Sequence, residues 1–234
     1  MDLRDRVLRA ALECFDDLGY DRTSIARIRE RSAVSNGALF HHFPNKEAIA
    51  DALYLEAMRS VQRGYSAALR GEPATLRDGV GDIVRTMLTW VQDNPRWARF
   101  LYARGQLDWS SAAGSELRTL NKDLSAAYRD WLGSFTGTGE VRDLPMTIVV
   151  AIVTGPAHAI AQRWLAGQIR GPLVGYADDL IDAAVAGLGG APAPRRGPAR
   201  RAPAEARVHI QCVSDDGALV FEGHSIAELT PVRS

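Results

Sequence analysis

The chain has 234 residues, of which 46% are hydrophobic and 24% charged, a composition that supports a buried core and excludes general disorder. Its 28 basic and 28 acidic residues cancel, which excludes a globally basic nucleic-acid binder but not a local basic patch. The two cysteines, Cys14 and Cys212, lie far apart without metal-ligand spacing, so we expect a reducing compartment, no disulfide scaffold and no metal site.

The first predicted element is an amphipathic helix over residues 3–18. Apolar side chains recur there at helical spacing, and Gly19 follows as the glycine that ends the helix. The first nine residues alternate Arg and Asp with single apolar residues, so they lack the continuous apolar stretch of a signal peptide. We therefore expect a cytoplasmic protein.

Two short helices follow, separated by a tight turn at residues 32–34. Each has two candidate capping residues, Thr23 or Ser24 for the first helix and Ser35 or Asn36 for the second. The second helix runs through His42 and ends before Pro44. A turn of roughly three or four residues between two short helices is typical of a helix-turn-helix, in which the second helix presents its first turn to DNA.

The same segment carries a local excess of positive charge. Between Arg22 and Lys46 there are five basic residues and one acid, Glu30, so the segment has a net charge of five minus one, or +4. The basic residues are Arg22, Arg27, Arg29, Arg31 and Lys46. Such a patch suits phosphate binding, with Arg27 on the first short helix as one candidate contact, although a solvated helix face has the same composition.

Three runs of residues in this region form a recognisable pattern. They are Phe15-Asp16-Asp17-Leu18-Gly19-Tyr20, Thr23-Ser24-Ile25-Ala26-Arg27-Ile28, and Val34-Ser35-Asn36-Gly37-Ala38-Leu39-Phe40-His41-His42-Phe43-Pro44-Asn45-Lys46-Glu47. Together they resemble the DNA-binding domain of the TetR family of bacterial transcription regulators. The likeness covers about the first fifty residues and is weak beyond them, where the family's ligand domains diverge.

The resemblance implies a set of residues at the DNA face. They are Thr23, Ser24, Ser35, Asn36, Gly37, Ala38, Phe40, His41 and Lys46, with Lys46 on a phosphate. Four positions depart from the family pattern, since Phe40 replaces the usual Tyr, Ala38 the usual Thr, Ala33 the usual turn glycine and Arg29 a small residue. These departures leave the fold intact and bear on which operator sequence is bound.

Beyond residue 46 the pattern stays helical up to residue 188. A long helix is expected over residues 46–69, and further helices over residues 76–92, 95–107, 116–135, 145–168 and 174–188. The most apolar segment, residues 145–160, is interrupted by Gly155 and Pro156 and is short for a membrane span of roughly 20 residues. We therefore expect no membrane partner. The resemblance implies that the last two helices pair with their copies in a second subunit.

The helical body offers aromatic and polar side chains for a ligand cavity, although ordinary core packing is the more common role for any one of them. Our candidates for ligand binding are Trp90, Trp97, Tyr102, Trp131 and His158. His158 is the preferred single candidate because a polar group on an apolar helix needs a partner.

The composition changes after residue 188. Residues 189–206 are rich in Pro, Arg and Ala, which favours a linker, and residues 207–234 alternate apolar and polar residues around Asp215-Asp216-Gly217, which favours a β-hairpin. The resulting division is a helix-turn-helix domain over residues 1–46, a ligand-binding and dimerisation domain over residues 47–188, the linker and the hairpin tail.

The sequence therefore predicts an all-α protein with a short C-terminal β-hairpin tail. We expect a homodimeric, ligand-responsive repressor that is released from a palindromic operator by a small molecule of unknown identity. The alternative is a DNA-binding regulator that is controlled by a protein partner or by its own C-terminal tail. No nucleophile-base-acid set, phosphate loop or metal cluster is visible, so we expect neither an enzyme nor a cofactor.

Overall fold

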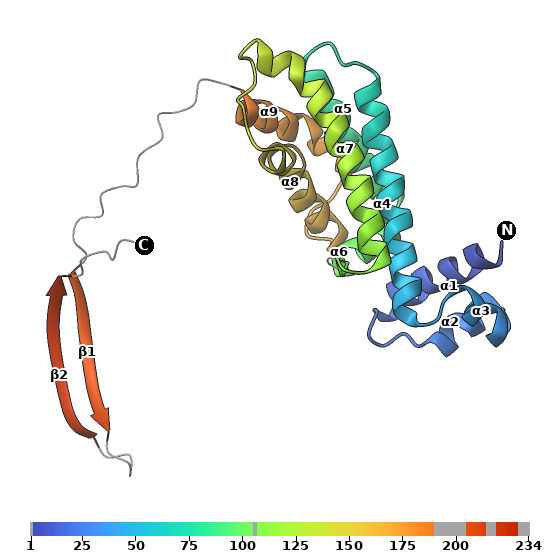
Figure 1. Ribbon diagram of the computed structural model, residues 1–234, viewed down its shortest axis with the longest axis horizontal. Helices are drawn as coiled ribbons and strands as arrows, with labels where there is room; N and C mark the ends of the chain where they lie inside the picture. The colour runs from blue at the N-terminus through green and yellow to red at the C-terminus, as the bar shows by residue number, and fades with distance from the viewer. Residues whose placement is uncertain (1, 105–106, 190–204, 214–218, 229–234) are drawn as a thin grey trace. The chain divides into compact units, whose positions relative to one another are not determined.

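The computed structural model describes residues 2–104, 107–189, 205–213 and 219–228 (Figure 1). The chain divides into two units, Met1–Ala191 and Pro192–Ser234. The described part of the first unit is almost entirely helical, as the sequence predicts.

The N-terminal helices are α1 (Leu3–Leu18), α2 (Ile25–Ser32) and α3 (Asn36–His42). Ser24 caps α2 and Ser35 caps α3, each through a side-chain oxygen that accepts a hydrogen bond from a backbone N–H in the first turn. Gly19 follows α1 with a φ of 81°, a left-handed value that favours glycine. The turn between α2 and α3 comprises residues 33–35, which is the compact connection expected of a helix-turn-helix.

The long helix α4 (Lys46–Arg70) belongs to two hydrophobic cores. Near its start, Ile49 and Leu53 are completely buried against α1, α2 and α3. Farther along, Val61 and Tyr65 are buried in the larger core of the helical body. The described part of the chain thus has no flexible linker between the N-terminal helices and that body.

The larger core is built by α4 together with the helices that follow it. These are α5 (Leu76–Asp93), α6 (Pro95–Arg104), α7 (Ala112–Gly137), α8 (Met146–Leu165) and α9 (Ala177–Leu188), with a short 3-10 helix (Leu173–Tyr176) before α9. Helix α6 reaches both cores, because Ala98 is buried in the larger core and Phe100 stacks on Phe15 of α1 with ring centroids 5.6 Å apart.

Some helix ends differ from the expected ones. Helix α6 ends at Arg104 rather than residue 107, and α7 begins four residues earlier than expected because the hydroxyl of Ser111 caps it. Expected helix 145–168 ends at Leu165, and expected helix 174–188 is split by the 3-10 turn that follows Pro172. The Gly and Pro residues that interrupt the helices lie where the sequence indicates, but the capping side chains determine the residue at which a helix begins or ends.

Helix α8 bears on the expectation that no segment crosses a membrane. It runs to Leu165, beyond the most apolar segment 145–160, and by length and composition it is the only helix in the described ranges that could cross a membrane. Only 28% of its most apolar window is buried inside the chain, and Ile148 is 47% exposed. The helix therefore has an apolar face that its own chain leaves largely uncovered.

The second unit contains two antiparallel strands, β1 (Glu205–Val213) and β2 (Leu219–Glu228), whose register runs from Glu205 opposite Glu228 to Val213 opposite Leu219. The expected hairpin falls on these two strands and stays a prediction, and β2 extends farther than the short apolar run suggests. The expected turn at Asp215-Asp216-Gly217 and residues 190–204 of the expected linker lie outside the described residues.

Candidate functional site

The first turn of α3 presents small and polar groups at the surface. Ser35, Asn36 and Gly37 are exposed, and an added Cβ at Gly37 would meet no other atom within 4 Å. On the same helix, His41 is exposed and Phe40 is 43% exposed, a large value for an aromatic side chain. Leu39 is completely buried and Ala38 partly buried. The exposed turn combines free backbone N–H groups with room for another molecule to approach closely.

The connection before α3 is held by a side chain that the sequence analysis did not single out. Arg6 donates hydrogen bonds from its guanidinium to the carbonyl oxygens of Ser32, at 2.8 Å, and Ala33, at 2.7 Å. Ala33 has a φ of 52°, a left-handed conformation that costs about 1 kcal/mol for a residue with a Cβ. The sequence could have indicated this role, because Arg6 lies in the apolar stripe of α1 between Leu3 and Ala10, where a guanidinium group needs hydrogen-bond partners.

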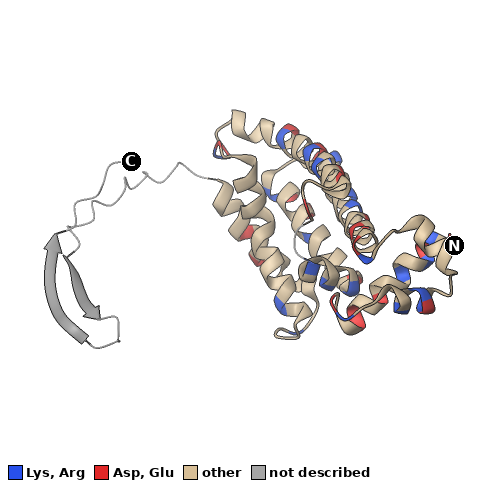
Figure 2. Ribbon diagram, turned by 60° about the horizontal axis from the view of Figure 1, so that its bottom comes forward, with Lys and Arg blue, Asp and Glu red and all other residues tan. Residues whose placement is uncertain are grey.

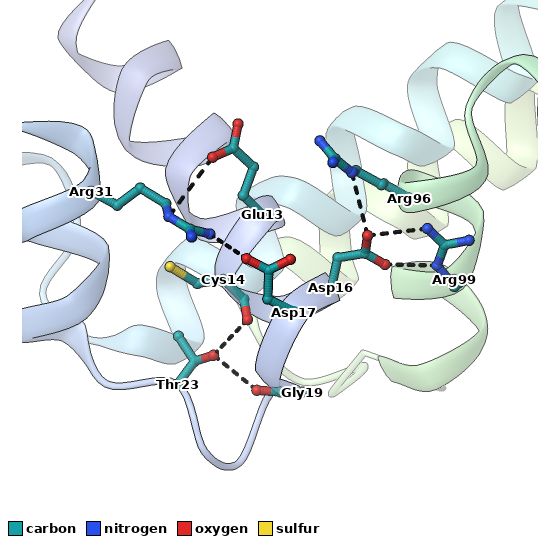
Figure 3. A network of polar contacts seen from close by, with 9 residues as sticks. All are labelled: Glu13, Cys14, Asp16, Asp17, Gly19, Thr23, Arg31, Arg96 and Arg99. Atoms are coloured by element: carbon teal, nitrogen blue, oxygen red, sulfur yellow. Dashed lines mark hydrogen bonds and ion pairs between the residues drawn. The ribbon is translucent and has the colours of Figure 1, made fainter.

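Thr23 has a structural position in the loop between α1 and α2. Its side chain is 2% exposed, and its hydroxyl lies 3.1 Å from the carbonyl oxygen of Cys14 and 2.9 Å from that of Gly19 (Figure 3). The neighbouring Ser24 is exposed and caps α2. The structure thus places Ser24 at the surface and Thr23 beneath it.

Lys46, at the start of α4, also contacts this loop. Its Nζ donates to the carbonyl oxygen of Tyr20 at 2.9 Å, lies 3.5 Å from that of Asp21, and sits 4.2 Å from the centroid of the Tyr20 ring. An ammonium group has three N–H donors, so these contacts leave capacity for one further acceptor.

The basic patch is partly neutralised within the chain. Arg31 pairs with Asp17 at 2.7 Å and with Glu13 at 3.9 Å, both on α1 (Figure 3). Arg27 is exposed and makes no ion pair within the described ranges. Figure 2 shows Lys and Arg interspersed with Asp and Glu along the helices. The positive charge available to a partner is therefore smaller than the sequence count of +4.

A second site is a cavity of about 680 Å³ between α4, α5, α6, α7 and α8. Three of the expected ligand-binding residues line it, namely Trp90, Tyr102 and His158. The other lining residues are Tyr54, Met58, Val61, Gln62, Tyr65, Met87, Val91, Ala98, Leu101, Asn121, Leu124, Ser125, Tyr128, Met146, Thr147, Val150 and Thr154. The size and the largely apolar lining are those of a small-molecule site.

Two polar pairs interrupt the apolar lining. The Tyr102 hydroxyl and His158 Nδ1 are 2.8 Å apart and join α6 to α8, while Gln62 Nε2 donates to Asn121 Oδ1 at 2.8 Å and joins α4 to α7. Burial lowers the pKa of His158, so its imidazole is neutral near pH 7. Burial also raises the pKa of Tyr102 to about 12, which keeps its hydroxyl protonated.

The remaining two candidates do not line the cavity. Trp97 packs against the N-terminal core, and Trp131 packs in the larger core between Tyr128 and Phe135, with ring centroids 6.4 and 5.8 Å away. Helical spacing places all these aromatics on apolar faces, and packing alone decides which of them meet the cavity. Gln62 was missed although a glutamine on the buried stripe of α4 was a visible signal.

Helix α6 connects the cavity to the N-terminal helices through ion pairs. Asp16 of α1 contacts Arg99 at 2.7 Å and Arg96 at 3.3 Å (Figure 3). The hydrogen bond from Arg99 is the main reason that the pKa of Asp16 is lowered, since it outweighs the effect of burial. Near the end of α6, Arg104 pairs with Asp51 of α4 at 3.0 Å.

In the part of the chain that the structure describes, no group of three or more His, Cys, Asp or Glu side chains is arranged to hold a metal ion. The two features that remain are the exposed turn of α3 and the cavity.

Comparison with known proteins gives consistent matches. Residues 7–53 match the family model described as bacterial regulatory proteins, tetR family. The chain is 30% identical over 146 residues to the HTH-type transcriptional repressor Rv1474c of Mycobacterium tuberculosis, which covers 60% of this chain and 70% of that protein. It is 45% identical over 56 residues to the A-factor receptor protein of Streptomyces griseus, but that match spans only 24% of this chain and 20% of the receptor.

A solved structure shows the same fold. The transcriptional regulator FadR from Bacillus subtilis, in complex with stearoyl-CoA, superposes with a TM-score of 0.66 at 17% identity, covering 79% of this chain and 98% of that one.

Proposed function

The chain belongs to the TetR family of bacterial regulatory proteins, and from that premise we propose that it is a ligand-responsive repressor that leaves a palindromic operator when a small molecule binds. It acts in the cytoplasm on double-stranded DNA. Residues 1–46 supply the DNA contacts, and residues 47–188 supply the ligand site and the dimer interface.

The observation that carries DNA binding is the exposed first turn of α3. Ser35 and Asn36 offer polar side chains beside free backbone N–H groups, and Gly37 leaves space for close approach. Backbone N–H groups at a helix start bind phosphate, while side chains such as Asn36 can read base edges. Ser24 and Arg27 on α2, and Lys46 on α4, flank this turn in the chain and supply further contacts.

The uncovered apolar face of α8 supports the proposal of a homodimer. A second copy that packs its own α8 and α9 against this face buries it and creates a two-fold axis. Two-fold symmetry presents two α3 helices to the DNA, which suits half-sites about 34–36 Å apart, or somewhat farther on deformed DNA.

The ligand response follows from the position of α6. Tyr102 faces the cavity, while Arg99 and Arg104 of the same helix hold α1 and α4. A ligand that shifts α6 or α4 therefore shifts α3 with it. Because coupling is reciprocal, DNA binding lowers the affinity for the ligand by the same factor as the ligand lowers the affinity for DNA. The corresponding coupling free energy is typically about 1–3 kcal/mol.

Operator binding by the purified full chain tests this proposal. DNA from the promoter regions around its own gene is used for gel-shift and footprinting, with sedimentation to measure the oligomer. We expect a dimer that protects two inverted half-sites, and Asn36→Ala should change the preference among operator variants. Arg129→Ala, which changes an exposed residue of α7 away from α3 in the chain, is the control and should leave this preference unchanged. A monomer that protects a single half-site contradicts the proposal, and release by a protein partner alone supports the alternative control.

A further inference from the structure

The cavity has no formal charge on its lining. None of its described lining residues is Asp, Glu, Lys or Arg. The polar side chains there are amides, hydroxyls, one indole and one imidazole. A bound carboxylate would meet no cation, and a bound amine would meet no carboxylate.

The titratable groups of the lining do not change this. Burial lowers the pKa of His158, so its ring is not a cation that could pair with a carboxylate at neutral pH. Burial raises the pKa of Tyr65, Tyr102 and Tyr128, so none of these phenols is an anion that could pair with an amine. The lining is therefore electrically neutral over the physiological range of pH.

A charged ligand would lose its hydration here without an opposite charge to compensate for it. Moving an ion out of water is strongly unfavourable unless a countercharge or a set of hydrogen bonds replaces the water. Aromatic faces such as Trp90 attract cations, but only by about 0.5–2 kcal/mol. The burial that lowers the pKa of His158 would also disfavour the charged form of any ammonium group placed beside it.

An uncharged polar group, in contrast, finds partners at two places. The Tyr102–His158 pair lies on the α6–α8 wall, and the Gln62–Asn121 pair lies on the α4–α7 wall. Each pair retains donor or acceptor capacity beyond its mutual hydrogen bond, because an amide has several such positions and an imidazole has two nitrogens.

We propose that the effector is an uncharged, largely apolar molecule that forms hydrogen bonds with one or both of these pairs, and that the cavity discriminates against carboxylates and amines with the same apolar body. This inference rests on the proposed function, because it specifies the ligand class of that site.

The test uses three probes that share one apolar chain, namely 1-decanol, decanoate and decylamine. Near neutral pH the first is uncharged, the second is an anion and the third a cation. Titration calorimetry on the full chain, with decanol below its solubility limit and the two charged probes below their micelle concentrations, should show decanol binding at least about tenfold more tightly than either charged probe. Equal or tighter binding of decanoate or decylamine overturns the inference, as does the absence of binding by all three.

A substitution that adds a charge sharpens the test. Asn121→Asp keeps an acceptor for Gln62 Nε2 while placing a carboxylate in the cavity, so the affinity for decylamine relative to decanol should rise about tenfold or more. Gln62→Glu supplies the same charge from α4 if the first variant does not fold. Thr119→Asp adds the charge to an exposed position of α7 and should leave the ratio unchanged. An unchanged ratio in the cavity variants contradicts the inference.

These measurements need no DNA, so the two proposals can fail separately. A chain that prefers decanol but binds no operator contradicts the proposed function alone. A chain that leaves its operator in response to decanoate, and does not bind decanol, contradicts the ligand class alone.

Discussion

Asp16 and Arg99 join α1 to α6 through two hydrogen bonds, Nε to Oδ1 at 2.7 Å and a terminal nitrogen to Oδ2 at 3.1 Å (Figure 3). The Asp16 side chain is only 14% exposed, and Arg96 contacts the same carboxylate. Because Tyr102 follows Arg99 by three residues on the same helix, this carboxylate joins α1 to a helix that lines the cavity.

Asp16→Asn should weaken the communication between the cavity and α3. The amide cannot neutralise two guanidinium groups, so the free energy of unfolding should fall by about 1 kcal/mol, and a cavity ligand should change operator affinity less than it does in the wild type. Operator titrations with and without ligand measure this. Asp17→Asn is the matched control, since Asp17 pairs with Arg31 inside the N-terminal helices. Equal loss of coupling in both variants would refute a specific role for Asp16.

The stabilisation from Asp16 should depend on pH in a defined direction. Its pKa is lower in the folded chain, mainly because Arg99 donates a hydrogen bond to it. A depressed pKa stabilises the fold fully above the ordinary pKa of an aspartate, about 4, and this contribution disappears as the pH falls through the lower folded value. The difference in unfolding free energy between wild type and Asp16→Asn, measured in urea, should therefore shrink below about pH 4. A constant difference would contradict this assignment.

Gly37→Ala should raise stability and lower operator affinity together. Alanine favours a helix over glycine by about 0.5–1 kcal/mol, and the added methyl group meets nothing in the free protein. On DNA the same methyl group occupies the space through which the backbone approaches. Thermal unfolding and gel-shift titration report the two effects. Gly133→Ala on α7 also adds a methyl group in open space and should leave operator binding unchanged.

Gly79→Ala should destabilise the helical body. A Cβ at this position would overlap the Trp131 ring, which Tyr128 and Phe135 hold in place. Overpacking of this kind costs about 1–3 kcal/mol, more than the gain in helix propensity. Chemical denaturation should show a loss for Gly79→Ala and a gain for Gly133→Ala. Equal stability of the two variants would show that Trp131 can move aside.

Lys46→Met should reduce the salt dependence of operator binding. The substitution keeps the unbranched apolar part of the side chain and removes the ammonium group, whose third N–H is available for a phosphate. The slope of log affinity against log salt should become shallower by about one, for all operator sequences alike. An unchanged slope would assign Lys46 solely to the loop at Tyr20.

The sequence predicted the elements better than the contacts between them. Gly19, Pro44 and the apolar periodicity locate the helices because stop signals and burial act locally. Whether Thr23 or Ser24 caps α2 depended on which hydroxyl could reach the carbonyl oxygens of Cys14 and Gly19, a tertiary contact. Likewise Trp90 and Trp131 lie on apolar helix faces, but only packing turns the first toward the cavity and the second into the core.

The sharing of α4 between two cores limits how the DNA-binding part can be exchanged among proteins. Ile49 and Leu53 complete the N-terminal core from beyond residue 46, and Phe100 completes it from α6. A fragment or graft that ends at residue 46 would expose Phe15 and Leu39 to water. Recombination between relatives therefore preserves this part as a working module only when the start of α4 and the face of α6 travel with it.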